Sequence, residues 1–355
     1  MKILLVRLRQ IGDVVFTTPT FAALHEHFPQ AHLSYLVEPA AAPVVRGNPH
    51  LARVIEAPRV RGMRGLIADL ALGRALAREQ FDLAIDFHGG PRASMLTWLS
   101  RAPRRVGYTV SGRAWMYTER VDRPRALRPR HSVENQWDLL SAIGVPPPSR
   151  DRHPVTMVVD AEAAQRVEAR LSAHHATGDA RLVVMHVSAG NPFRRWPIAS
   201  FAEVAAGLAA ADASVRVIVT SGPSEEGAAA EVIAAARGRL DEGRRAHVLS
   251  CGEFSLSELR ALVERAALYV GGDSGPMHIA GCSHVPMVSL YGPTLPVRSE
   301  PWRSAHIPAL AAESHGLTCR PCDQRVCEPG DFRCLTQVRP EDVLAAGVRL
   351  LARNG

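Results

Sequence analysis

Short runs of apolar residues alternate along the chain with longer segments in which apolar residues recur every three or four positions. The short runs predict buried parallel strands, and the longer segments predict amphipathic helices. The predicted strands are residues 1–6, 33–37, 53–56, 81–86, 182–187, 215–220, 247–250, 268–270 and 285–290. The predicted helices are residues 11–26, 64–79, 198–210, 225–237, 255–266 and 341–352. Strands that alternate with helices indicate an α/β fold with parallel sheets.

The proline-rich residues 144–148 interrupt this pattern, which then starts again. A chain of 355 residues is also too long for one ordinary domain. We therefore expect two doubly wound domains, residues 1–150 and residues 151–355. If the two sheets face one another, the cleft between the carboxyl ends of their strands is the expected ligand site.

Composition and charge narrow the class of protein. The formal net charge is +7, carried almost wholly by arginine because Lys2 is the only lysine, and a positive chain favours anionic partners. No nucleic-acid-binding module is recognisable, so we expect no nucleic-acid partner. Only four apolar residues separate Lys2 from Arg7, which is too short for a signal peptide, and no later apolar run reaches the roughly 18 residues of a membrane span. These features predict a cytoplasmic protein without a transmembrane segment, one that can still touch a membrane surface.

A glycine pair and a predicted short helix follow the strand at 268–270. Residues 271–272 predict a sharp turn, and either Asp273 or Ser274 can cap the helix. Free N–H groups and the helix dipole at such an end bind anions, typically phosphate. Asp273 can instead accept a hydrogen bond from a sugar, and His278, one turn into the helix, can donate one to a diphosphate. The alternative is a capped βα turn with His278 packed beside it.

Asp13 lies where the first predicted strand leads into the first predicted helix. A carboxylate at a helix N-terminus is stabilised in its charged form and is available to accept a proton. It would act as a general base only with a suitably tuned pKa. The alternative is that Asp13 caps the helix.

Four of the six cysteines lie within 16 residues near the C-terminus, in the spacing C-x2-C-x4-C-x6-C. They are Cys319, Cys322, Cys327 and Cys334. Four thiolates in a loop can hold a structural Zn or Fe ion tetrahedrally, and the first pair has the spacing of a metal knuckle. The alternative is four reduced, partly buried thiols or a redox-labile pair.

Seven segments of the chain, in order, resemble those of glycosyltransferase family 9, the ADP-heptose:lipopolysaccharide heptosyltransferases. The segments are residues 3–19, 82–94, 105–108, 131–134, 186–197, 273–278 and 291–294. Each is a weak signal alone, but all of them in this order make a specific one. The resemblance covers the whole chain.

This resemblance implies a GT-B fold, in which two Rossmann-like domains face each other across a cleft. It implies inverting transfer of heptose from ADP-L-glycero-β-D-manno-heptose to the lipopolysaccharide inner core, with no cofactor or metal for catalysis. Asp13 would be the general base, the N-terminal domain would bind the acceptor, and the C-terminal domain would bind the nucleotide sugar. The implied donor-binding residues are Ser188, Arg194, Asp273, Ser274, Gly275, Met277 and His278. The implied acceptor-binding residues are Arg59, Arg61, His88, Arg92 and Arg105.

One residue departs from the family pattern. The family usually has a lysine two residues before the tryptophan that opens the donor half, whereas this chain has Arg194 before Trp196. An arginine can grip a diphosphate through two parallel hydrogen bonds. The alternative is that Arg194 and Arg195 form a solvated surface pair and that Trp196 is a packing residue.

The acceptor half is rich in arginine between residues 101 and 130, and Arg59, Arg61 and Arg64 form a smaller group. The arginines of the longer segment are Arg101, Arg104, Arg105, Arg113, Arg120, Arg123, Arg125, Arg128 and Arg130. By the resemblance, they suit the phosphates and carboxylates of a lipopolysaccharide core and lipid A acceptor at the cytoplasmic face of the inner membrane. Trp115 and Tyr117 could lie at that interface. The alternative is an ordinary solvated basic face.

Two other kinds of protein remain open on sequence alone. One is another enzyme of the GT-B class, with a different sugar donor or acting as a sugar-nucleotide 2-epimerase. The other is a non-catalytic sugar-nucleotide-binding protein, which would tolerate the loss of Asp13.

Overall fold

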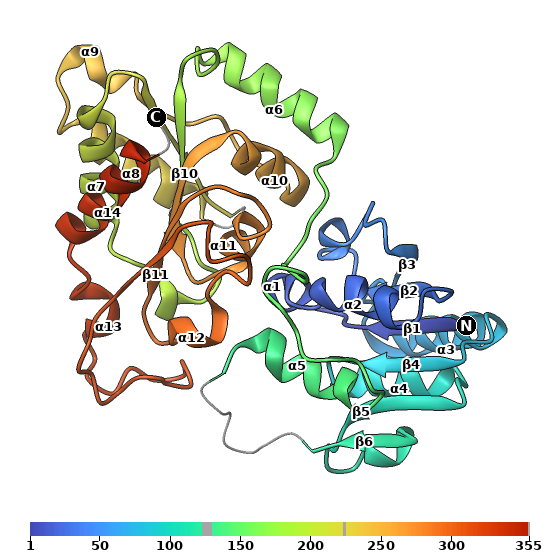
Figure 1. Ribbon diagram of the computed structural model, residues 1–355. Helices are drawn as coiled ribbons and strands as arrows, with labels where there is room; N and C mark the ends of the chain where they lie inside the picture. The colour runs from blue at the N-terminus through green and yellow to red at the C-terminus, as the bar shows by residue number, and fades with distance from the viewer. Residues whose placement is uncertain (123–129, 223–224, 354–355) are drawn as a thin grey trace. The chain divides into compact units, whose positions relative to one another are not determined.

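The computed structural model describes residues 1–122, 130–222 and 225–353. The chain divides into two compact units, Met1–Val158 and Val159–Gly355. Each unit contains a six-stranded sheet, and all the strand pairs in the described residues are parallel (Figure 1). The predicted α/β class with doubly wound parallel sheets is therefore confirmed.

The first unit alternates strands and helices, with two short 3-10 helices, η1 and η2. Its elements are β1 (Lys2–Val6), α1 (Ile11–Val15), α2 (Pro19–His27), β2 (His32–Val37), η1 (Ala42–Val44), β3 (Leu51–Glu56), α3 (Gly62–Arg78), β4 (Leu83–Asp86), α4 (Pro91–Leu99), β5 (Arg104–Tyr108), η2 (Ala114–Met116), β6 (Glu119–Val121) and α5 (Ser132–Ser141). The strand order is β3-β2-β1-β4-β5-β6. Alternate residues of β1, Leu4 and Val6, pack with Ala84 of β4 and Leu96 of α4 in the core.

The second unit has the same kind of alternation. Its elements are α6 (Ala161–Ala173), β7 (Arg181–His186), η3 (Pro192–Arg194), α7 (Ile198–Ala211), β8 (Val215–Thr220), α8 (Glu226–Arg237), α9 (Glu242–Arg245), β9 (Val248–Leu249), α10 (Leu256–Glu264), β10 (Ala266–Gly272), α11 (Gly275–Ala280), β11 (Met287–Tyr291), α12 (Pro296–Ser299), β12 (Ala309–Glu313), α13 (Arg333–Thr336) and α14 (Pro340–Ala352). The strand order is β12-β11-β10-β7-β8-β9, which repeats the order of the first unit.

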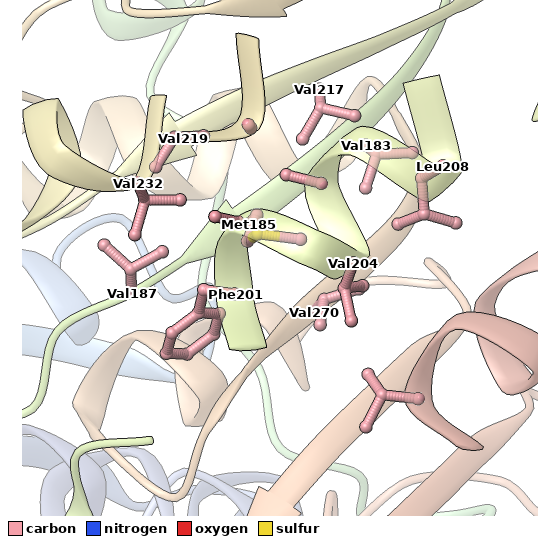
Figure 2. Close-up of a cluster of buried hydrophobic side chains, with 14 of the residues drawn as sticks. Val183, Met185, Val187, Phe201, Val204, Leu208, Val217, Val219, Val232 and Val270 are labelled. Atoms are coloured by element: carbon pink, nitrogen blue, oxygen red, sulfur yellow. The ribbon is translucent and has the colours of Figure 1, made fainter. Parts of the chain in front are cut away.

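The core of the second unit is built from the apolar faces of strands, which repeat every two residues, and of helices, which repeat every three or four. Figure 2 shows side chains of strands and helices meeting in this core. Val183 and Met185 of β7 are two residues apart and lie on one face of the strand, as a pleated strand requires. Phe201, Val204 and Leu208 of α7 are spaced three and four residues apart, which places them on one face of the helix.

Each strand order contains a reversal of direction, which defines where ligands can bind. The reversal lies between β1 and β4 in the first unit and between β7 and β10 in the second. In doubly wound sheets, the loops at the carboxyl ends of these two central strands diverge and leave a crevice for a ligand. The residues that follow β1, β4, β7 and β10 are therefore the first place to look for chemistry.

The predicted helix over residues 11–26 is wrong in its continuity, because α1 ends at Val15 and α2 begins at Pro19. Proline has no N–H and favours the first turn of a helix, so it starts a new helix here. The hydroxyls of Thr17 and Thr18 donate to the carbonyls of Val14 and Val15 at 2.6 and 2.8 Å, which satisfies the end of α1.

The predicted turn at residues 271–272 is also wrong, because both glycines belong to β10 and pair with Ser289 and Leu290 of β11. A Cβ at position 272 would lie 3.3 Å from the carbonyl oxygen of Arg194. The glycine therefore serves a close approach of two backbones. Ser255 and Glu258 form a capping box at the start of α10.

Every helix in the part of the chain that the structure describes is too short or too polar to cross a membrane.

Candidate active site

Asp13 lies in the first turn of α1, just after β1. Its Oδ2 atom forms an ion pair with Arg7, which also donates to the carbonyl of Phe87 at 2.6 Å. Within the described residues, its Oδ1 atom has no hydrogen-bond partner, and 37% of the side chain is exposed. Asp13 does not cap the helix, because Gln10 holds the cap position without a side-chain bond. The carboxylate is thus oriented by Arg7 and open to a ligand.

Asp86 ends β4 and is fully buried, so burial raises the pKa of its carboxyl group. It accepts hydrogen bonds from the backbone N–H groups of His88 and Gly89 at 2.8 and 2.9 Å, and from the hydroxyl of Tyr117 at 2.6 Å. These bonds compensate for the burial of the carboxyl group. They also fix the turn that carries His88.

His88 is a neutral imidazole at neutral pH. Burial and the positive charges of Arg7 and Arg9 lower its pKa to about 4, although the charge of Asp13 opposes them. Its Nδ1 atom is buried and has no hydrogen-bond partner in the described part of the chain. A neutral imidazole has one N–H donor and one acceptor nitrogen, so His88 can donate a hydrogen bond to a ligand or accept one from it.

In the second unit, Asp273 follows β10 and only 2% of its side chain is exposed. Arg194 donates through Nη1 to its Oδ2 atom at 3.2 Å and to its carbonyl oxygen at 3.0 Å. The hydroxyl of Thr294 donates to Oδ2 at 2.5 Å, and Nε2 of His278 lies 3.5 Å from Oδ1. The buried carboxylate therefore holds the guanidinium at the carboxyl end of β10.

Gln324, in the cysteine-rich segment, holds Arg194 from another side. Its Oε1 atom accepts from Nε of Arg194 at 2.7 Å and from Nδ2 of Asn191 at 2.9 Å. Among the described residues, Nη2 of Arg194 has no hydrogen-bond partner, and 28% of the side chain is exposed. One edge of the guanidinium therefore points at its own chain, and one nitrogen is left for a ligand.

Ser188 follows β7 and is buried. Its Oγ atom lies 3.0 Å from Nε2 of His186 and accepts from the N–H of Gly222 at 2.8 Å. Burial lowers the pKa of His186 to about 4, and its Nδ1 atom lies 3.0 Å from the hydroxyl of Thr220. Ser188 thus links the ends of β7 and β8 at the crevice of the second sheet.

The family of the chain can now be read from its relatives. The sequence profile of glycosyltransferase family 9 (heptosyltransferase) matches residues 70–329. The chain is 25% identical to lipopolysaccharide heptosyltransferase 3 of Escherichia coli over 345 residues, which covers 96% of each chain.

The chain belongs to glycosyltransferase family 9.

Solved structures of this family have the same fold. The family 9 glycosyltransferase of Veillonella parvula superimposes with a TM-score of 0.84 at 23% identity, covering 99% of this chain and 97% of that one. The ADP-heptose lipopolysaccharide heptosyltransferase II of E. coli gives 0.78 at 19% identity, covering 100% and 99%. The chain therefore has the GT-B fold of the family 9 heptosyltransferases.

The remaining donor candidates of family 9 cluster around α11. Ser274 holds the cap position of α11 but makes no side-chain cap bond, and its Oγ atom is buried without a partner in the described residues. Gly275 begins the helix, and the side chain of Met277 is fully buried with the hydroxyl of Tyr291 3.7 Å from its sulfur. The structure gives Met277 a packing role. The expected side-chain cap at Asp273 or Ser274 is wrong.

The contacts around Arg194 and Arg195 exclude the alternative that these arginines form a solvated surface pair. Arg195 forms an ion pair with Glu225 and donates to the carbonyl of Ala189 at 3.0 Å. Trp196 is buried and donates to the carbonyl of Val338 at 3.2 Å. Arg194 and Arg195 are therefore both held by their own unit, and Trp196 packs in the core.

The acceptor candidates differ in how far the protein itself engages them. Arg59 and Arg61 are exposed. Arg92 donates to both carboxylate oxygens of Asp69 and to Glu38, and Arg105 donates to the carbonyls of Met116 and Ala102 at 2.8 and 2.5 Å. Both of these arginines brace the first unit. The bonds of Arg92 to Asp69, Glu38 and the carbonyls of Ala57 and Pro58 occupy all of its N–H donors, whereas Nη2 of Arg105 has no partner in the described residues.

In the basic segment at 101–130, the expectation that Tyr117 lies at a membrane interface is wrong. Tyr117, expected at a membrane interface, is buried against Asp86, whereas 56% of Trp115 is exposed. The ring of Tyr117 also packs against Gly107, where there is no side chain to displace it. Arg123, Arg125 and Arg128 lie outside the described residues.

The four clustered cysteines line one cavity of about 370 Å³, whose wall also includes Phe193 and Phe332. Burial and the neighbouring thiols raise the pKa of Cys334. Within residues 1–122, 130–222 and 225–353, however, no three His, Cys, Asp or Glu side chains are placed to hold a metal ion. The expectation of a structural Zn or Fe is therefore not supported. A shared loop brings the thiols near one another without giving them the common centre that a metal needs.

Sequence reasoning missed three features of this site. Arg7 and Gln324 orient Asp13 and Arg194, and no local pattern in the sequence marks either contact. A pocket at the carboxyl ends of β8 and β9, with Val219 and Ile233 as apolar wall and Glu253 as polar rim, adjoins Gly222. The position of these strand ends beside β7 was the available signal.

Proposed function

We propose that this chain is an inverting heptosyltransferase that moves heptose from ADP-L-glycero-β-D-manno-heptose to the lipopolysaccharide inner core. Membership of glycosyltransferase family 9 supports the class of reaction. The observation that carries the mechanism is the carboxylate of Asp13, which is oriented by Arg7 and has one oxygen open at the carboxyl end of β1.

In this mechanism, Asp13 accepts the proton of an acceptor hydroxyl as that oxygen forms its bond to the anomeric carbon. The bond from the anomeric carbon to the diphosphate breaks on the opposite face, and its electron pair leaves with ADP. A β-linked donor then gives an α-linked product. No metal takes part in these steps.

The developing charge on the leaving diphosphate needs positive partners, since its stabilisation is the main electrostatic task of the site. Arg194, with Nη2 unused in the described structure, and the unpartnered Oγ of Ser274 are the groups we assign to it. Because Nε and Nη1 are engaged by Gln324 and Asp273, Arg194 would meet the diphosphate through Nη2, where the family's lysine offers a point charge. The apolar pocket at Val219 and Ile233 would take the nucleoside.

We further propose that the first unit binds the acceptor through His88 and its arginines and that the second unit binds the donor. The acceptor is the lipopolysaccharide core carried on lipid A at the cytoplasmic face of the inner membrane. The protein would work there as a peripheral enzyme.

The test is the variant Asp13→Asn, assayed by mass spectrometry of the acceptor and by ADP release with and without acceptor. We expect kcat to fall by about 10²–10⁴-fold, the usual worth of a general base. The matched control is Asp138→Asn, another part-exposed aspartate paired with an arginine, Arg130, in the same unit. Full transfer by Asp13→Asn would contradict the mechanism, and ADP release that needs no acceptor would contradict the reaction class.

A further inference from the structure

Helix α3 exposes an apolar stripe that nothing in the proposed chemistry uses. Met63, Leu66, Ile67 and Leu70 are 72%, 48%, 61% and 36% exposed. Their spacing of i, i+3, i+4 and i+7 places them on one face over the first two turns. The opposite face, with Gly65, Gly73 and Leu76, is buried, so the stripe is an outer surface of the first unit.

Positive charge continues and borders this stripe. Arg74 follows Leu70 by four residues and Arg78 follows Arg74 by four, so both extend the same face of α3. Arg64 lies beside the stripe in the first turn. In the described structure, the side chains of these three arginines form no hydrogen bond or ion pair. The same is true of the side chains of Arg59 and Arg61, just before the helix.

Negative charge is missing from the same face. The acidic residue of α3 is Asp69, which lies on the inner side and is bound by Arg92 through both carboxylate oxygens. Glu79, just beyond the helix, pairs with Arg53 at 2.7 Å. The exposed side of α3 is therefore apolar and cationic, with no local carboxylate to neutralise it.

Two exposed tryptophans stand on neighbouring elements. Trp98 of α4 and Trp115 of η2 are 42% and 56% exposed, and their rings meet edge to face at 5.5 Å. Helix α4 packs against both α3 and η2. Tryptophan pairs an apolar body with a polar N–H, the composition found where proteins enter the headgroup layer of a bilayer.

We infer that the α3 stripe and its arginines, with the two tryptophans of the adjoining α4 and η2, bind the surface of a bilayer that contains anionic lipid. Apolar side chains enter the acyl boundary while arginines meet lipid phosphates. A second copy of this chain fits less well, because a two-fold contact would bring two sets of unpaired arginines together. The inference rests on the proposed function in one respect: the lipid-linked acceptor would be presented at this surface.

Vesicle flotation of the full chain tests the inference without an activity assay. We expect binding to vesicles of phosphatidylglycerol and phosphatidylethanolamine that falls about tenfold or more on phosphatidylcholine vesicles or in high salt. Ile67→Glu should lose this binding by a similar factor, and Arg74→Ala should weaken it. The matched control Val348→Glu, a 39% exposed valine of α14 in the second unit, should bind like the parent.

The outcomes separate the possible occupants of the face. Unchanged vesicle binding by Ile67→Glu would overturn the inference, as would equal binding of the parent to neutral vesicles. A parent dimer that Ile67→Glu turns into a monomer, with no vesicle binding by either, would assign the face to a second copy. Transfer to a delipidated, water-soluble core should be the same for Ile67→Glu and the parent. Absence of transfer in both would refute the proposed function and leave the flotation result standing.

Discussion

At the scale of single residues, the candidate site contains charged groups that are each held by a partner of opposite charge. Arg7 positions Asp13, and Asp273 positions Arg194 from the end of a neighbouring strand. In both cases one atom stays unengaged within the described structure, Oδ1 of Asp13 and Nη2 of Arg194. An oriented group with one free atom is the arrangement expected of a residue that contacts substrate.

Gln324 offers a test of this idea, because it touches Arg194 without belonging to the strand ends. Replacing Gln324 with Ala removes the acceptor of the Arg194 Nε–H at 2.7 Å and leaves the guanidinium held by Asp273 alone. We expect KM for the nucleotide sugar to rise about tenfold, the usual worth of a hydrogen bond to a charged group, with a smaller change in kcat. Steady-state kinetics with varied donor measure both constants.

Two controls make the result specific to Gln324. Gln324→Glu keeps an acceptor oxygen and should restore most of the donor affinity, which a purely structural role would not predict. Gln337→Ala, at an exposed glutamine in the same C-terminal region, should behave as the parent. Parent-like KM in Gln324→Ala would show that Arg194 needs no such support.

At the scale of elements, the strand β5 and the residues around η2 are coupled through a glycine. A Cβ at Gly107 would overlap the ring of Tyr117, whose hydroxyl is fixed by Asp86 at 2.6 Å. Gly107→Ala should therefore lower the free energy of unfolding by about 1–3 kcal/mol, the cost of overpacking a buried site. Urea denaturation followed by circular dichroism measures it.

The comparison for this prediction is Gly227→Ala in α8, where no atom lies within 4 Å of the added carbon. There we expect stability to stay the same or to rise by up to about 1 kcal/mol, because alanine favours a helix over glycine. An equal loss of unfolding free energy in both variants would contradict the claim that overlap with the ring of Tyr117 causes the loss.

The cysteine-rich segment also allows a prediction at this scale. Because the described residues offer no three-ligand metal centre, we expect less than one equivalent of Zn or Fe per chain in protein purified without chelator. Chelation should leave Tm unchanged. A stoichiometric metal, or a fall in Tm on chelation, would reinstate the metal site expected from the spacing.

Which elements the sequence predicted, and which it did not, depends on the range of the interactions that form them. Strands such as β1, β7 and β8 are mostly apolar, so a local pattern identifies them. The edge strand β6 is only 3 residues long and begins with Glu119 and Arg120. The edge strand β12 is alanine-rich and exposed or half-buried along its length, so its pattern is not that of a buried strand. Pro19 indicates a possible helix start, but the periodic pattern of apolar residues on both sides of it favoured one continuous helix.

The site was predictable to a similar depth. Asp13 and residues 273–278 follow predicted strands, so their placement at strand ends was inferable from local order. The contacts of Arg194 with Gln324 and of Tyr117 with Asp86 join residues 130 and 31 positions apart, which only the folded chain brings together. The buried position of Tyr117 could not be read from an arginine-rich segment that looked solvated.

At the scale of the whole molecule, the free energy of unfolding should depend on pH in acid because of the buried imidazole of His186 in the second sheet. Burial lowers the pKa of His186 to about 4, against about 6.5 in an unfolded chain. The unfolded chain therefore binds a proton more readily as pH falls below 6.5, and the stability that is fully present at pH 7 is lost toward pH 4.

Between pH 7 and pH 5 this one group should reduce the free energy of unfolding by about 2 kcal/mol. His186→Gln removes the titration and should flatten the pH dependence by that amount, as measured by urea unfolding at the two pH values. His306→Gln, at an exposed histidine, should leave the slope unchanged. The same slope in all three proteins would mean that other groups control the acid response.

The contact between Arg194 and Gln324 has a consequence for the history of the sequence. A lysine in place of Arg194 would offer the amide of Gln324 no guanidinium edge to bind. Selection would then act on the two positions together, although 130 residues separate them along the chain. Lineages that exchange lysine for arginine at one should show a matching replacement at the other, as a correlated pair.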